Sequence, residues 1–314
     1  MTDDEIKKLV DYLNRNENRI IKDIGRQYKK SLDALISRLS QIYVKGGKDQ
    51  LNFSDVARTN DIAKLENFVL QQADKLQTEN RRSILGLLVS IYIYSFDTQK
   101  SAIETEVKKA LGFDFWLKNS HDAEIIHIMQ GKSDKQIKRL LMALEKNDIE
   151  GLKLTPALER NRRMIIQDIK QAIERGFIEK KGYTSMAKGI QGAFDMGLNR
   201  ATAIARTEGH RVRETASYDS AMNADFQGIK MQKFWMNMGD ERVRHRPGAN
   251  HVSMEGQTRD VNEPFDLGWG IQAQYPGMSG DAANDIRCRC IARYKIVGID
   301  PSLKQGKRGG ITVE

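Results

Sequence analysis

The stretch IRCRCIARYKIV, residues 286–297, alternates between two kinds of side chain. The apolar or small set is Ile286, Cys288, Cys290, Ala292, Tyr294 and Ile296. Apart from Ile291, the positions between these residues carry a basic set: Arg287, Arg289, Arg293 and Lys295. A period of two with one apolar face is typical of a half-buried β-strand. The pattern predicts a strand here, with both cysteine side chains on its buried face.

These two cysteines are the only ones in the chain, and the sequence leaves several roles open for them. Free thiols behave as small apolar side chains and are often buried. A disulfide is disfavoured because neighbouring positions on one strand face suit its geometry poorly. A zinc site would need Cys288, Cys290, His251 and either His245 or Asp240. Because Cys-x-Cys lacks the spacing of a zinc knuckle, the first expectation is no cofactor, with zinc as the alternative.

Upstream of this strand, the sequence predicts helices as far as about residue 224. From Asp3 to about Tyr43, apolar residues recur at steps of three and four, which places them on one stripe of a long helix. That stripe consists of Ile24, Tyr28, Leu32, Leu35, Leu39 and Ile42. Further helices are predicted over 81–111, 132–148, 155–177, 180–194 and 199–224.

The character of the chain changes at Gly228. The short aromatic stretch IKMQKFWMNM, 229–238, has no helix signals, and we expect it to form a strand with Trp235. A segment rich in Gly, Asn, Asp and Pro follows it. The fold class is therefore predicted to be α+β. We expect an extended helical N-terminal region over 1–180, a small mixed α/β domain with a few strands over 181–300, and a flexible basic tail over 301–314.

Composition narrows the class of protein. The 314 residues carry a net charge of +9, which permits a polyanionic partner without requiring one. The beginning, MTDDEIKKLV, is polar and does not resemble a signal peptide. The longest apolar run, ILGLLVSIYIY at 84–94, is too short to span a bilayer. We therefore expect a soluble protein made in a reducing cytoplasm, with no membrane partner.

Two polar stretches could carry chemistry. In GDERVRHRPGANH, 239–251, the arginines could bind phosphate and a histidine could act as a general base. The favoured interpretation is that these side chains form a network of ion pairs that orders a long loop. In ARTEGHRVRETASYDSA, 205–221, helical spacing places Glu208 near Arg211. Glu208 could be a catalytic carboxylate. The favoured alternative is a buried anchor paired with an arginine of the 242–246 loop.

The order of these pieces resembles the phage Mu protein F-like family, the minor head or head morphogenesis proteins of tailed phages and prophages. The resemblance covers about residues 180–297. Its motif positions here are Arg206-Thr207-Glu208, Asp240, Arg242, Arg244, His251, Gly256, Pro264-Phe265 and Cys288-Arg289-Cys290. The spacer HRPGAN, before His251, departs from the family pattern and makes His245 a second candidate for the histidine position; His251 is preferred.

The resemblance implies a structural role in the virion. Such proteins associate with the portal at one vertex of the procapsid and influence DNA packaging or ejection. The motif residues would then form a shared scaffold, and the basic set of 287–295 would suit portal carboxylates or DNA bound without sequence preference. Scaffolding or major capsid protein would be further partners. The expected location is the capsid interior near the portal vertex, after synthesis in the host cytoplasm.

An enzyme is the alternative class. A metal-dependent hydrolase or a toxin-like transferase would use His251, Glu208 and the pair Cys288 and Cys290. The favoured expectation is a protein that is not an enzyme and has no catalytic residues.

Overall fold

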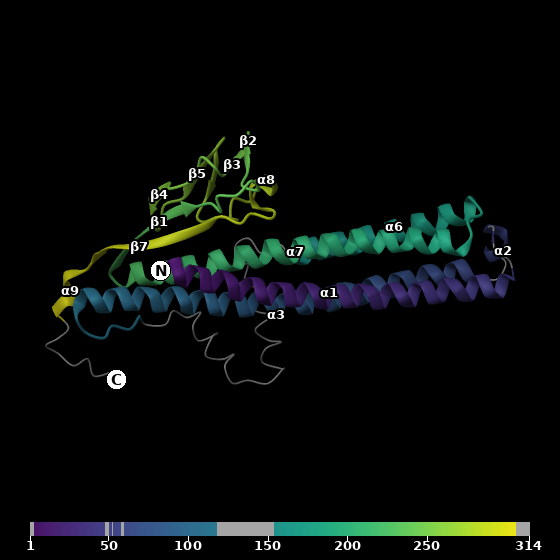
Figure 1. Ribbon diagram of the computed structural model, residues 1–314, viewed down its shortest axis with the longest axis horizontal. Coiled ribbons are helices and arrows are strands. Elements are labelled where there is room, and N and C mark those ends of the chain that lie inside the picture. Colours follow the sequence, from purple (N-terminus) through teal and green to yellow (C-terminus); the bar gives the residue numbers. More distant parts are fainter. Residues whose placement is uncertain (1–2, 48–49, 52, 58–59, 118–153, 306–314) are drawn as a thin grey trace. The chain divides into compact units, whose positions relative to one another are not determined.

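The computed structural model describes residues 3–47, 50–51, 53–57, 60–117 and 154–305 (Figure 1). The helix predicted over 132–148 and most of the predicted tail lie outside these residues. None of the described helices is long and apolar enough to cross a membrane.

The fold is α+β, as the sequence predicted: long helices precede short antiparallel sheets (Figure 1). The helices before the sheets are α1 (Asp3–Gly46), α2 (Phe53–Ala57), α3 (Asp61–Leu111), α6 (Leu154–Ile178) and α7 (Tyr183–Phe226). The strands are β1 (Ile229–Met236), β2 (His245–Arg246), β3 (Ala249–Asn250), β4 (Thr258–Asp260), β5 (Phe265–Gly268), β6 (Ile271–Ala273) and β7 (Ile291–Ile299). Two short helices are α8 (Ala282–Asp285) and α9 (Pro301–Gln305).

The chain divides into two compact units. One takes in the described residues of Asn16–Leu87 and Lys153–Arg206 and is helical. The other takes in the described residues of Met1–Arg15, Leu88–Leu152 and Thr207–Glu314 and contains all of the strands. The boundaries between the units fall within α1, α3 and α7, so each of these helices contributes residues to both.

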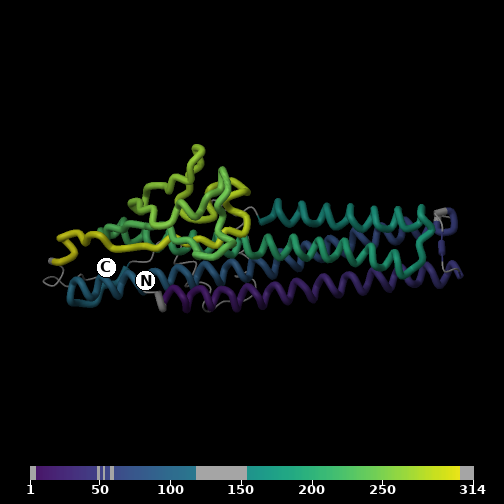
Figure 2. The backbone as a smooth tube through the Cα atoms, turned by 45° about the horizontal axis from the view of Figure 1, so that its top comes forward, coloured from purple at the N-terminus to yellow at the C-terminus, as the bar shows by residue number. Residues whose placement is uncertain are grey.

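In the helical unit, segments of α1, α3, α6 and α7 run side by side (Figures 1 and 2). The predicted apolar stripe of α1 faces this core, since Ile24, Leu35 and Leu39 have no exposed surface. Gly197 lets α7 approach α6 closely: a Cβ at this position would lie 2.7 Å from Ile165 Cγ1. The helical periodicity therefore predicted the buried face correctly.

In the other unit, β1 is the central strand of a sheet with the order β4-β1-β7, and both pairings are antiparallel. Alternate residues of β1 are buried, and Trp235 is 1% exposed among them. The predicted strand around Trp235 is thus confirmed. The same buried side of β1 also carries Lys233, an unusual residue for a strand core.

The strand predicted over 286–297 begins later than the alternation suggested. β7 starts at Ile291, so Cys288 and Cys290 lie in the extended segment that enters it and not in the strand. Arg287 adopts a left-handed conformation with a φ of 58°, which interrupts any strand at that point. Ile286 is 49% exposed, whereas the alternation placed it in the core.

Candidate functional site

The centre of the candidate site is formed by His251, Cys288 and Cys290. The Nδ1 atom of His251 lies 3.6 Å from the Cys288 sulfur and 3.5 Å from the Cys290 sulfur. The three side chains are only 2–3% exposed. Both sulfurs therefore lie on the same side, as predicted, although the strand itself starts after them.

The orientation of the His251 ring is set by Asn284 of α8. The Asn284 side-chain amide nitrogen donates to the carbonyl oxygen of Gly248 and to the Asp281 carboxylate, at 3.0 and 2.8 Å. Its amide oxygen must then accept from His251 Nε2, 3.0 Å away. Because Nε2 carries the proton, Nδ1 presents a lone pair to the two sulfurs.

The two thiols titrate as a pair. The hydrogen bond with Cys290 lowers the pKa of Cys288 well below its ordinary value, and interactions with His210 and His251 add to this. The hydrogen bond with Cys288 and burial raise the pKa of Cys290. The two shifts have opposite directions because the two sulfurs share one hydrogen bond, in which Cys290 donates and Cys288 accepts.

A polar network surrounds α8 and supports the cluster. The Asp285 carboxylate accepts from the backbone N–H groups of Ser279 and Gly280, at 3.0 and 2.8 Å. Arg211 of α7 lies between Asp285, at 3.9 Å, and Glu208, at 3.3 Å. These buried charges connect α7 to α8, which carries Asn284.

The expected pairing of Glu208 with an arginine of the 242–246 loop is wrong. Glu208 is 4% exposed and contacts Arg211, one helical turn away, as the spacing within the helix had indicated. Arg244 of the loop instead donates to the backbone carbonyl groups of Asn284 and Ile286. An arginine on the same helix reaches Glu208 without ordering a loop, so the local pair forms.

The remaining loop residues are also held by ion pairs. Asp240 accepts from Arg289 at 2.8 Å and from Arg242 at 3.1 Å. The hydrogen bond from Arg289 holds the pKa of Asp240 far below its ordinary value. Neither Asp240 nor the exposed His245 joins the histidine–cysteine cluster, so the four-ligand sets expected from the sequence do not form among the described residues.

Of the other site residues predicted from the sequence, some are exposed and others contact protein groups. Arg287 and Lys295 are exposed. Arg293 lies over the Phe234 ring, with its guanidinium carbon 5.5 Å from the ring centroid. Arg206 belongs to the helical unit, where it lies 3.8 Å from Glu17. The basic residues of 287–295 therefore do not form one continuous exposed surface.

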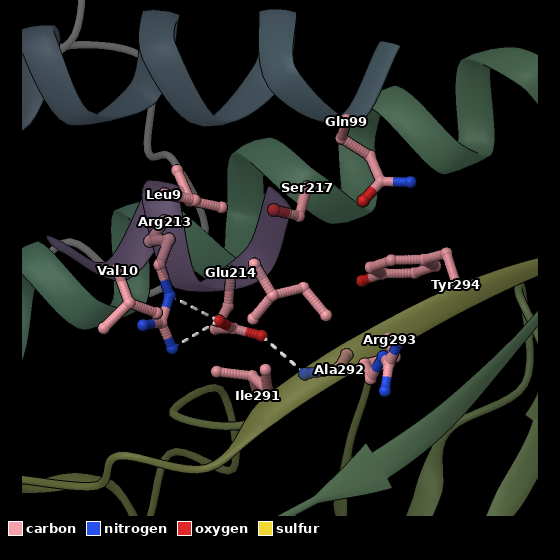
Figure 3. Close-up of a pocket in the computed structure, with 11 residues that line it drawn as sticks. Leu9, Val10, Gln99, Arg213, Glu214, Ser217, Ile291, Ala292, Arg293 and Tyr294 are labelled. Atoms are coloured by element: carbon pink, nitrogen blue, oxygen red, sulfur yellow. Dashed lines mark hydrogen bonds and ion pairs between the residues drawn. The ribbon is translucent and has the colours of Figure 1, made fainter. Parts of the chain in front are cut away.

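Glu214 is a buried residue that the sequence did not single out. Its carboxylate accepts from Arg213 Nε at 2.7 Å and from the backbone N–H of Ala292 at 2.7 Å, which fastens β7 to α7 (Figure 3). A cavity of about 30 Å³ lies beside it and is lined by Ser217 and Tyr294 among others (Figure 3). That volume has room for about one water molecule and no larger ligand.

Lys233 is the second residue that sequence reasoning missed. Its ammonium donates to the carbonyl oxygens of Val261 and Gln274 and to the Gln274 side-chain oxygen, at 2.9, 2.7 and 2.9 Å. Burial lowers the pKa of Lys233 to about 7. The available signal was its place in the period-two pattern of β1, between Met231 and Trp235, which predicts an inward side chain.

Known proteins with similar sequences include a phage head protein and a bacterial enzyme. The chain is 26% identical over 304 residues to the minor head protein GP7 of Bacillus phage SPP1, which covers 97% of this chain and 90% of that protein. It is 29% identical over 165 residues to an NAD(+)–arginine ADP-ribosyltransferase of Enterococcus faecalis, which covers 52% of this chain but only 33% of that enzyme. No solved structure matches at a significant level.

The family model named "Phage Mu protein F like protein" matches residues 165–293. This range takes in α7, the loop with His251 and the two cysteines. The resemblance inferred from the motifs is thereby confirmed: residues 165–293 of this chain are similar to the phage Mu protein F-like family.

Proposed function

We propose that this chain is a minor head protein of a tailed phage that docks at the portal vertex of the procapsid and assists DNA packaging or ejection. Support comes from the similarity to a minor head protein over nearly the full length of both chains. A match of that extent includes the long helices as well as the strand-containing unit. Long amphipathic helices are suited to packing against other subunits.

The observation that carries a docking role is the burial of the candidate catalytic side chains. Glu208 and His251 are 4% and 2% exposed, and each has a protein partner. A residue that acts on a substrate must line an open pocket. The hydrolase or transferase alternative would need these buried groups to be uncovered, so we favour docking over turnover.

Binding to DNA, if it accompanies docking, would rest on few contacts. Arg287 and Lys295 are exposed, whereas Arg289 and Arg293 are already engaged by Asp240 and Phe234. Contacts to phosphate groups alone are independent of sequence and weaken steeply as salt rises. We therefore expect non-specific, salt-sensitive binding that falls further when Arg287 and Lys295 are both changed to Glu.

Co-purification tests the proposal most directly. The portal protein of the same phage, carrying an affinity tag, is co-expressed with this chain, and the chain should be retained through size-exclusion chromatography. Procapsids made without it should assemble but yield fewer infectious particles. Absence of the chain from both the portal complex and purified virions would contradict the proposal.

A pair of histidine variants separates docking from catalysis. His251→Ala should lower infectious yield only as far as it lowers the amount of folded, portal-bound protein. His245→Ala is the matched control, because His245 is exposed in the same loop. A His251→Ala protein that folds and binds the portal yet gives no infectious particles would favour the enzyme alternative.

A further inference from the structure

The cluster of His251, Cys288 and Cys290 has a chemistry that the docking role does not use. We propose that these three side chains bind one zinc ion, which fastens the loop after β3 to the segment that enters β7. The three potential ligand atoms all lie within 4.8 Å of one another and belong to buried residues. This inference is independent of the portal and concerns the stability of the strand-containing unit.

The distances in the cluster are those of a zinc coordination sphere. With Zn–S bonds of about 2.3 Å and Zn–N bonds of about 2.0–2.1 Å, a tetrahedral site separates nitrogen from sulfur by about 3.5 Å. The observed separations from His251 Nδ1 are 3.6 Å to Cys288 and 3.5 Å to Cys290. An ion could therefore enter with little movement of these atoms.

The surroundings prepare His251 to act as a ligand. Metal-bound histidines usually donate their second ring N–H to an oxygen of the protein, which fixes the tautomer and the ring plane. Asn284 has this position here, and its own amide group is fixed by Gly248 and Asp281. The Trp235 and His251 rings pack edge to face, with their centroids 5.4 Å apart, and this contact restrains the imidazole further.

Charge and hydrogen bonding also favour a metal. The lone pair on Nδ1 can accept from only one thiol, whereas two sulfurs lie within 3.6 Å of it. Zinc would replace both protons and make contact with all three ligand atoms. Two thiolates also cancel the charge of Zn²⁺, and a neutral site is far less costly to bury than a charged one.

Three protein ligands leave one coordination position. Among the described residues, no fourth His, Cys, Asp or Glu has a ligand atom within 4.8 Å of all three, but the imidazole of His210 in α7 lies close enough to Cys288 to interact with it. Asp240 is held by Arg289, and His245 is exposed. The fourth position would take a water molecule or, after a small movement, His210, whose Nε2 is buried without a hydrogen-bond partner in the described part of the chain; four protein ligands are usual in a zinc site that stabilises a fold.

The first experiment measures the metal in the full chain. Protein produced with added zinc and dialysed against metal-free buffer should retain about one zinc per chain, as expected for one site with three protein ligands. Native mass spectrometry should find the mass of one zinc ion less two protons, because each thiol loses its proton on binding. Removing zinc with a strong chelator should lower the Tm by about 5 °C or more.

Cobalt and the thiols provide an independent readout. Replacement of zinc by Co²⁺ should produce absorption bands of sulfur-to-cobalt charge transfer and of tetrahedral cobalt. Since Cys288 and Cys290 are the only cysteines, a thiol reagent reports on this site alone. Both thiols should react in the chelator-treated protein and be protected once zinc is restored.

Variants locate the site. Cys290→Ser and His251→Ala should lose the cobalt bands, whereas His245→Ala should keep them. If the site variants do not fold, the spectrum and the mass of the wild-type protein decide the question. Wild-type protein that is folded but holds no metal, gives no charge-transfer band with cobalt and shows the same thiol reactivity with and without zinc would overturn the proposal.

Discussion

Lys233 should make the stability of the strand-containing unit depend on pH. Its side chain has no exposed surface, and burial lowers its pKa to about 7 from an ordinary value of 10.5. Below pH 7 the lysine is protonated in both the folded and the unfolded chain, and the full cost of burying the ammonium is present. Between pH 7 and 10.5 only the unfolded chain binds the proton, so the free energy of unfolding rises with pH.

The size of this effect follows from the two pKa values. Between pH 7 and pH 9 the linkage relation gives a gain of about 2 kcal/mol in the free energy of unfolding. Lys233→Met replaces the lysine with an unbranched apolar side chain that has no titrating group. The difference between the wild-type protein and the variant should therefore change by about 2 kcal/mol over this range, whatever its value at pH 7.

Tryptophan fluorescence provides the assay. Trp235 is 1% exposed, whereas Trp116 and Trp269 are 74% and 81% exposed. In a background with the two exposed tryptophans changed to Phe, urea unfolding of both proteins is followed by the red shift of Trp235. Parallel stability curves from pH 7 to pH 9 would refute the reasoning and mean that the three oxygens and two aromatic rings around the ammonium keep it charged.

Two further substitutions test other buried contacts. Glu208→Gln should lower the free energy of unfolding by about 3 kcal/mol, because it removes the carboxylate beside the buried guanidinium of Arg211; denaturant unfolding measures this, and an unchanged midpoint would mean that the pair contributes little. Gly197→Ala should destabilise the helical unit by about 1–3 kcal/mol, since the added methyl group would overlap Ile165. Gly192→Ala is its control on the same helix, because a Cβ there meets nothing within 4 Å and should leave the Tm unchanged or raised.

Periodicity in the sequence determined much of the helical architecture. The stripe of α1 lies in the core because residues three and four apart share one helix face wherever the helix packs. The same rule placed α6. The aromatic stretch around Trp235 has no helix signals, and this identified it as a strand. Such patterns depend only on neighbours along the chain, so they can be read without the fold.

The tertiary structure decided which polar groups meet. Alternation continues through Cys288 in the sequence, but β7 starts at Ile291, which pairs with Met236, the last residue of β1. The sequence offered three possible partners to Glu208 in the 242–246 loop, whereas a nearby arginine on its own helix contacts it. Loop conformation depends on contacts between distant residues, and no local pattern encodes it.

For the candidate metal site too, the sequence indicated one part and the tertiary structure another. The sequence by itself favoured no cofactor and left the histidine and the two cysteines as candidate zinc ligands, because those side chain types bind zinc and belong to one short domain. Only the folded chain could exclude Asp240, which pairs with Arg289, and add Asn284, whose amide oxygen turns the His251 lone pair toward the sulfurs. Lys233 depended on the fold in the same way, because an ammonium can be buried only where oxygens far along the chain surround it.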